Sequence, residues 1–277
     1  MHHPPPDPTR RPLLLAVPDT PAAAPVGPGE TFGHPGASAH AYYRRRRAAE
    51  WTLYQRTLPL RLAGVALTSL LAALAVDQVA PALVGWAGLM AAGLVGWRLR
   101  FRVSQDARNW QRGARGERRT ARQLDRLARH GWVVFHDLAV PDSCANADHL
   151  AIGPAGVFLA DSKNWRGRLA FAPDGTLWHG SYPLTATLAT IGFEAQAIAG
   201  ALAVPGLAVE PLLVVHGSTI PWGEQYLGGV PILPAGRLVA TLLALPPLLT
   251  EQQVVQLAEQ QVVQLAHRIM ARLHSAA

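Results

Sequence analysis

Two carboxylates and one amine with the spacing of a hydrolytic site lie between Ala147 and Trp165. Asp148 precedes the tetrapeptide Gly153-Pro154-Ala155-Gly156, and the pair Asp161 and Lys163 follows it. Two neighbouring carboxylates repel each other unless a divalent cation neutralises them, and oxygen ligands suit Mg²⁺ or Mn²⁺. The residue types therefore favour metal-assisted phosphodiester hydrolysis. A surface hairpin with an ordinary Asp–Lys ion pair is the alternative interpretation.

Lys163 is the sole lysine among 25 basic residues, so the other 24 are arginines. A compact ammonium can hold an attacking water or stabilise charge that develops on a phosphate. The broad, planar guanidinium of arginine is a poor substitute in that role. A bound metal ion would lower the pKa of its water and polarise a phosphoryl oxygen. This chemistry explains a single lysine in a chain that otherwise uses arginine.

The tetrapeptide predicts a tight turn between two strands. With Pro154 and Ala155 at its centre, Asp148 lies directly opposite Asp161, and their Cβ atoms are roughly 5 Å apart. Because side chains alternate along a strand, one covered face holds seven residues: Asp148, Leu150, Ile152, Val157, Leu159, Asp161 and Lys163. We therefore expect Asp148, Asp161 and Lys163 at the open end of an otherwise apolar face. His149 points to the other face, where we expect it to be structural or exposed.

A third acid is expected from the helix that precedes this hairpin. The segment from Gly116 to Gly131 reads as a helix ending at its second glycine. Thr120, Leu124 and Leu127 follow helical spacing and mark its inward stripe. Glu117 continues that stripe toward the N-terminal end of the segment, so we expect its carboxylate to point toward the core.

These residues resemble a known family. The sequence GARGE at 113–117, followed by NADHLAIGPAGVFLADSKNWRG at 146–167, is similar to the NERD (nuclease-related) domain. That family in turn resembles the PD-(D/E)xK nuclease superfamily, whose motif matches Asp148 and Asp161-Ser162-Lys163. The residues that carry the motif cover 113–167. Aspartate stands at 161 where many members of the family have glutamate, which shortens the carboxylate arm by one methylene.

The resemblance implies an α/β fold with a restriction-endonuclease-like mixed central sheet flanked by helices. It also implies cleavage of nucleic acid, DNA above all, with Mg²⁺ or Mn²⁺ and without a small-molecule cofactor. The residues it implies are the metal ligands Asp148, Asp161 and Glu117, the catalytic Lys163, and Gln196 as a polar residue on the Ala-rich helix. A nuclease-like fold that binds nucleic acid or a membrane as a scaffold, without turnover, is the alternative function.

Two apolar segments precede this domain, at residues 58–76 and 79–97. The second has no charge and would rise about 28 Å as a helix, close to the thickness of a bilayer core. Arginines flank both segments on their outer sides, and the turn between them carries only Asp77. By the positive-inside rule, the sequence predicts a multi-pass transmembrane hairpin of a cell membrane with both chain ends in the cytoplasm. A buried helical hairpin in a soluble domain is the alternative.

The domain order that follows is a disordered Pro-rich tail (1–43), basic flanks with the hairpin (44–102) and a cytoplasmic nuclease-like domain (103–277). Within the last domain, residues 132–140 and 211–217 read as buried strands, and 185–202 as a helix. Thr250 and Gln253 form a capping box for a terminal helix. With 49% hydrophobic residues, the chain can bury a core of its own.

The formal charge of +7 suggests an anionic partner, either nucleic acid or a phospholipid surface. Eleven arginines oppose three acids between residues 98 and 129. That stretch could contact lipid or a nucleic-acid backbone, or be a solvated helix. Cys144 is the single cysteine, which excludes an intramolecular disulfide and a cysteine-based zinc cluster. The oligomeric state is left open.

Overall fold

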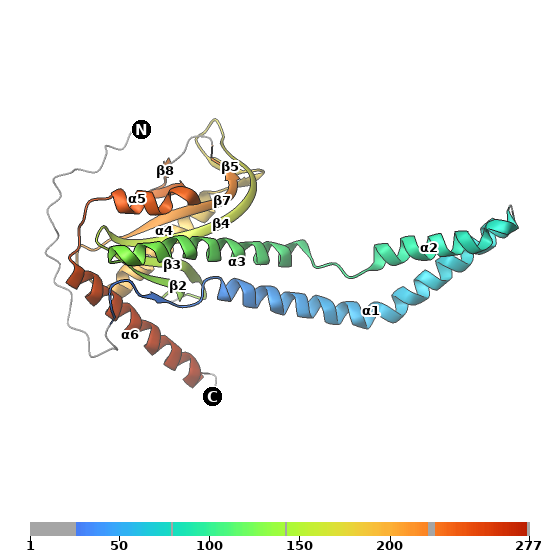
Figure 1. Ribbon diagram of the computed structural model, residues 1–277, viewed down its shortest axis with the longest axis horizontal. Helices are drawn as coiled ribbons and strands as arrows, with labels where there is room; N and C mark the ends of the chain where they lie inside the picture. The colour runs from blue at the N-terminus through green and yellow to red at the C-terminus, as the bar shows by residue number, and fades with distance from the viewer. Residues whose placement is uncertain (1–25, 79, 142, 221–224, 276–277) are drawn as a thin grey trace. The chain divides into compact units, whose positions relative to one another are not determined.

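The computed structural model describes residues 26–78, 80–141, 143–220 and 225–275. The chain divides into two compact units, one comprising Met1–Ala39 with Arg112–Ala277 and the other His40–Gln111. Each unit is described by itself below. Figure 1 shows the course of the chain through both.

The first unit is built on a mixed sheet with the strand order β1-β2-β3-β4-β7-β9-β8. Its strands are β1 (Thr31–Phe32), β2 (Val133–Ala139), β3 (Asn146–Gly153), β4 (Gly156–Phe171), β7 (Val209–Thr219), β8 (Gln225–Leu227) and β9 (Val230–Pro234). Strands β2, β3 and β4 are antiparallel neighbours, whereas β4, β7 and β9 run parallel. Two short strands lie off this path. Strand β5 (Leu177–His179) pairs in antiparallel fashion with the end of β4, and β6 (Tyr182–Pro183) pairs with β5.

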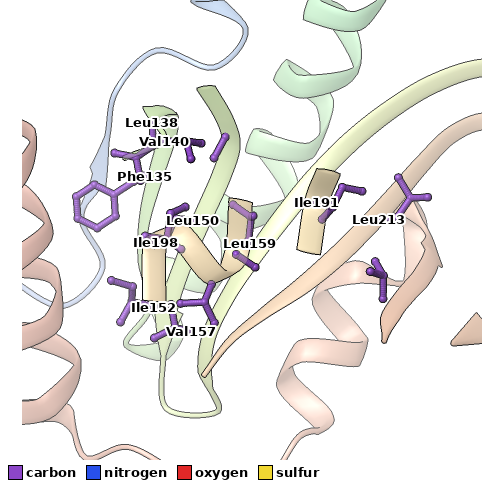
Figure 2. Close-up of a cluster of buried hydrophobic side chains, with 14 of the residues drawn as sticks. Phe135, Leu138, Val140, Leu150, Ile152, Val157, Leu159, Ile191, Ile198 and Leu213 are labelled. Carbon is purple, nitrogen blue, oxygen red and sulfur yellow. The ribbon is translucent and has the colours of Figure 1, made fainter. Parts of the chain in front are cut away.

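Helices cover both faces of this sheet, as the two buried side-chain clusters show. One cluster joins Leu150 and Leu159 to Ile191 of α4 (Thr185–Leu202) and Leu257 of α6 (Glu251–Ser275). Figure 2 shows Leu150, Leu159 and Ile191 in this layer. The other cluster joins the opposite face to α3 (Gln105–Leu124), the 3₁₀ helix η2 (Asp125–His130) and α5 (Leu238–Ala244). The expected α/β class, a mixed sheet with flanking helices, is therefore confirmed.

The turn chemistry and the periodicity predicted the local structure correctly. Gly153 pairs with Gly156 and Leu150 with Leu159, which is the register expected from a turn centred on Pro154 and Ala155. Helix α4 has the predicted bounds, and η2 ends at Gly131, whose φ is +76°. The capping box is present: the Thr250 N–H donates to Gln253 Oε1 at 2.8 Å, and the Gln253 N–H donates to Thr250 Oγ1 at 3.3 Å.

The predicted tail of residues 1–43 lies partly outside the described residues, which begin at residue 26. The described part differs from the expected irregular chain, because it contains β1 and the start of α1 (Ala37–Asp77). Strand β1 pairs in parallel with β2, and the Ser38 N–H donates to Asp137 Oδ2 at 2.8 Å. Contacts with residues distant in sequence order this segment, and no local periodicity reveals them.

The second unit contains most of α1, the 3₁₀ helix η1 (Pro81–Leu83) and α2 (Val84–Leu99). The first predicted apolar segment lies within α1, and the second lies in η1 and α2 from Pro81 on; residue 79 is outside the described residues. Helix α1 and the helical segment Pro81–Leu99 are long and apolar enough to cross a membrane, and none of the residues in their most apolar windows is buried. Arg61 Nη1 donates to the Leu99 carbonyl oxygen at 3.2 Å, which joins α1 to the end of α2. These apolar surfaces therefore face outward.

Candidate active site

The hairpin of β3 and β4 brings Asp148 to the segment that contains Asp161 and Lys163. The Ser162 N–H donates to Asp148 Oδ2 at 2.7 Å, so the carboxylate is held against the backbone of the neighbouring strand. Burial, followed by the negative charges of Asp161 and Glu117, raises the pKa of Asp148 well above its ordinary value. The two aspartates that the turn geometry predicted to be opposed thus interact strongly.

Asp161 and Lys163 form a close ion pair. Lys163 Nζ donates to Asp161 Oδ1 at 2.6 Å. Burial alone would lower the pKa of Lys163, but the carboxylates of Asp161 and Asp148 outweigh it and hold that pKa above its ordinary value. The second carboxylate oxygen, Asp161 Oδ2, is buried and has no hydrogen-bond partner among the described residues. One acceptor at the centre of the group therefore remains unsatisfied.

Glu117 on α3 is the third acid, and it is buried as the inward stripe predicted. Burial raises its pKa to about 7, and the negative charges of Asp137 and Asp161 add to the increase. Lys163 acts in the opposite direction. The structure therefore brings together four of the five residues expected from the sequence: Glu117, Asp148, Asp161 and Lys163.

A buried hydrogen-bond chain ties α3 to the strand that carries these residues. Ser162 Oγ donates to Thr120 Oγ1 at 2.8 Å, and Thr120 Oγ1 lies 2.8 Å from His216 Nε2 on β7. Asn164 adds a second link, because its Nδ2 donates to the Arg112 carbonyl oxygen at 3.0 Å. These contacts fix the position of the helix that carries Glu117. No local sequence pattern joins the three members of this chain, so it could not be predicted from the sequence.

Gly116 allows α3 to approach β4. Its substitution by alanine is expected to destabilise the protein by about 1–3 kcal/mol, the usual cost of overpacking, because the new Cβ would lie 2.7 Å from Asn164 Cβ. Gly113→Ala is the matched control on the same helix, with nothing within 4 Å of the added atom. Alanine there is expected to stabilise the helix by up to about 1 kcal/mol. Thermal unfolding of both variants measures the difference, and equal melting temperatures would contradict the close approach.

Helix α4 supplies an acid that the sequence analysis did not single out. Glu194 is 9% exposed and lines a pocket together with Asp161 and Lys163. Gln196, the expected polar residue of this helix, is exposed and is not among the pocket residues. The reason is helical geometry: Glu194 is three residues after the buried Ile191, whereas Gln196 is rotated to the solvent side. Glu194 could have been predicted in the same way as Glu117, because it lies at helical spacing from buried apolar residues of its own helix.

His149 and His136 form a buried pair on the α3 side of the sheet, which resolves the expectation that His149 is structural or exposed. His149 is fully buried, and its Nδ1 lies 2.8 Å from His136 Nδ1. His136 Nε2 lies 3.4 Å from Asp125 Oδ1. Burial lowers the pKa of both histidines, and in His149 the neighbouring His136 adds to the decrease.

The carboxylate oxygens of this site are suitable ligands for a hard divalent cation. Carboxylate oxygens are the preferred ligands of Mg²⁺, which commonly keeps several waters and binds only one or two carboxylates of the protein. The unsatisfied, buried Asp161 Oδ2 is such a donor. Within the described residues, no three His, Cys, Asp or Glu side chains lie close enough together to enclose an ion. The residues therefore fit a partly hydrated ion better than a fully enclosed one.

Comparison with protein families gives a match to NERD, the nuclease-related domain, over residues 112–216. The matched range contains Glu117, Asp148, Asp161, Lys163 and Glu194. The resemblance seen in the sequence is confirmed over this part of the chain. Comparison with curated proteins and with solved structures gives no match.

Proposed function

We propose that the nuclease-related domain contained in residues 112–216 hydrolyses phosphodiester bonds of nucleic acid, DNA above all, with a divalent cation. The observation that carries the proposal is the meeting of Asp148, Asp161 and Glu117 around a single lysine. Burying three acids beside one lysine, with Asp161 Oδ2 unsatisfied, costs free energy. Binding of a cation and a phosphodiester would account for this arrangement, whereas the stability of the fold does not.

The residues present suggest a division of roles. One or two of the carboxylates of Asp148, Asp161 and Glu117, together with water, would hold Mg²⁺ or Mn²⁺. When bound, such an ion polarises a phosphoryl oxygen and lowers the pKa of its water. In the metal-free chain the carboxylates of Asp161 and Asp148 hold the pKa of Lys163 above its ordinary value. This favours a role as a fixed cation that binds a phosphate oxygen or orients water.

Cleavage by the full chain tests the proposal. We expect linear duplex DNA, single-stranded DNA or RNA to be cut in Mg²⁺ or Mn²⁺, and cutting to stop when a chelator is added. The preferred substrate identifies the nucleic-acid class. Equal cleavage with and without chelator would contradict a metal-dependent mechanism. Binding of nucleic acid without any cleavage would favour the second candidate, a scaffold without turnover, which the lack of a three-ligand group among the described residues supports.

We also propose that α1 and α2 anchor the protein in a membrane. Their apolar side chains face outward, with Leu67, Leu71, Leu89 and Leu94 all more than half exposed. Arginines flank the pair at its outer ends, and Asp77 lies at the turn. Apolar surface of this extent is costly in water and favourable in lipid. The charge pattern would place the nuclease-related domain on the cytoplasmic side.

Fractionation of cells that express the full chain tests the anchor. We expect the protein in the membrane fraction and resistant to alkaline extraction. Leu71→Arg, which places a charge within the first apolar segment, should reduce insertion, since a central arginine costs about 2.5–3.5 kcal/mol. Leu243→Arg on α5, an exposed leucine of the other unit, is the control and should leave insertion unchanged. Recovery of the parent chain in the soluble fraction would contradict the anchor.

A further inference from the structure

A pocket of about 160 Å³ opens between β4 and α4 beside the ion pair. Six residues line it: Asp161, Lys163, Thr187, Thr190, Ile191 and Glu194. Two of the six are acids from different elements, one on the central strand and one on the helix that crosses over it. The pocket therefore has two carboxylates facing a space large enough for an ion with its water.

Neither acid is satisfied by the protein. Glu194 makes no hydrogen bond and no ion pair with any other described residue, although it is 9% exposed. Asp161, 8% exposed, has one oxygen on Lys163 Nζ, while Oδ2 is buried and has no partner within the described part of the chain. Burial of an unpaired carboxylate to this extent costs free energy, and the surrounding residues do not offset this cost. Both observations favour a cation as the partner of these acids.

Lys163 does not pair with both acids in this structure. Among the described residues its Nζ donates to Asp161 Oδ1, and Asp148 and Glu117 also contribute negative potential to the same region. The negative charge of Asp161 acts on Glu194 across the pocket that both residues line, against the opposing effect of Lys163. The repulsion between Glu194 and Asp161 therefore persists with the lysine in place. A divalent cation with oxygen ligands would remove it.

We propose that Glu194 is a ligand of a divalent cation bound in this pocket together with Asp161. The inference rests on the proposed metal-dependent function, and it assigns to α4 a ligand that the D-x-K motif does not contain. Water completes the coordination, as is usual for Mg²⁺ held by few carboxylates. Gln196, which the family resemblance suggested for this helix, is exposed and does not line this pocket.

Binding of Mn²⁺ to the full chain tests this assignment without reference to cleavage. Titration followed by the electron paramagnetic resonance of free Mn²⁺ is expected to show at least tenfold weaker binding for Glu194→Gln than for the parent. Gln196→Ala, two residues along the same helix and exposed, is the matched control and should bind Mn²⁺ like the parent. Melting temperatures without metal identify any unfolded variant; Glu194→Gln should melt no lower than the parent, since it removes an unpaired buried charge.

The results separate failure of this inference from failure of the proposed function. Parent-like Mn²⁺ affinity in Glu194→Gln, with binding lost in Asp161→Asn, would overturn the role of Glu194 and leave the proposed nuclease intact. If the parent itself does not bind Mn²⁺, the inference is overturned as well. The cleavage assay with chelator then decides separately whether the proposed function stands. Weaker binding in both the Glu194 and the Asp161 variants supports the inference.

Discussion

Replacement of Lys163 by methionine is expected to lower the rate of nucleic-acid cleavage by roughly 10²–10³, the usual loss when a preorganised charge-stabilising donor is removed. Methionine has a similar length and no charge, so it removes the cation from the pocket with little change in volume. The effect should fall on the catalytic rate constant. Single-turnover cleavage with saturating enzyme measures it directly.

Lys163→Arg is the matched variant for this prediction. It keeps the positive charge but places a broad, planar group where a compact ammonium donates to Asp161. We expect it to be nearly as defective as the methionine variant. Nucleic-acid binding and its salt dependence should be unchanged in both, because the many arginines of the chain supply the charge that binding requires. Full activity in the arginine variant would show that charge alone is needed at this position.

Replacement of Glu117 by glutamine is expected to stabilise the metal-free protein at neutral pH. In the folded chain burial raises the pKa of Glu117 to about 7, above its ordinary value of 4.5. Below pH 4.5 the carboxyl is protonated in both the folded and the unfolded state and favours neither. As the pH rises toward 7, the unfolded chain loses this proton more readily, so the free energy of unfolding falls, by up to about 1.4 kcal/mol per pH unit. Above pH 7 the loss is complete.

The stability difference between the glutamine variant and the parent should therefore be absent below pH 4.5, grow between pH 4.5 and 7, and then stay constant. Chemical unfolding at a series of pH values in the presence of chelator measures it. Glu210→Gln, an exposed acid on β7, is the control and should show no such growth. A stability difference independent of pH would contradict the buried, charge-repelled state of Glu117.

The free energy of unfolding of the glutamine variant must be compared with that of the parent at each pH, because buried histidines change the stability with pH in the opposite direction. Burial lowers the pKa values of His136, His149 and His216, with Arg119 contributing to the last. As the pH falls below the ordinary histidine value of 6.5, the unfolded chain takes up protons that the folded chain resists, and stability falls. The parent and the glutamine variant share this loss, so it cancels in their difference. Addition of Mn²⁺ should reduce the remaining difference if Glu117 contributes to the cation site.

The hairpin at the centre of the site could be predicted from the sequence because its information is local. A four-residue turn fixes which residues face each other, and alternation then assigns the faces, so Leu150 opposite Leu159 follows from the sequence alone. The inward position of Glu117 follows from helical spacing in the same way. Predictions based on a turn or on one helical stripe were correct wherever the structure tests them.

The contacts that assemble the site depend on residues far apart in the chain. Thr120 meets Ser162 across 42 positions and His216 across 96. His136 lies opposite His149 in the pairing of β2 with β3. A longer loop connects these two strands, so turn geometry does not set their register. Gln196 was suggested by analogy with a family pattern, whereas the rotation of α4 against the sheet exposes it and buries Glu194.

Local features of the sequence, namely the D-x-K spacing, the turn and the lone lysine, predict the kind of chemistry and identify the strand that carries its residues. Which further acids reach Asp161, from α3 on one side and α4 on the other, depends on the packing of the fold. The physical reason is that helical periodicity determines which residues share a face. The approach of that face to the sheet depends on packing contacts such as that of Gly116 with Asn164.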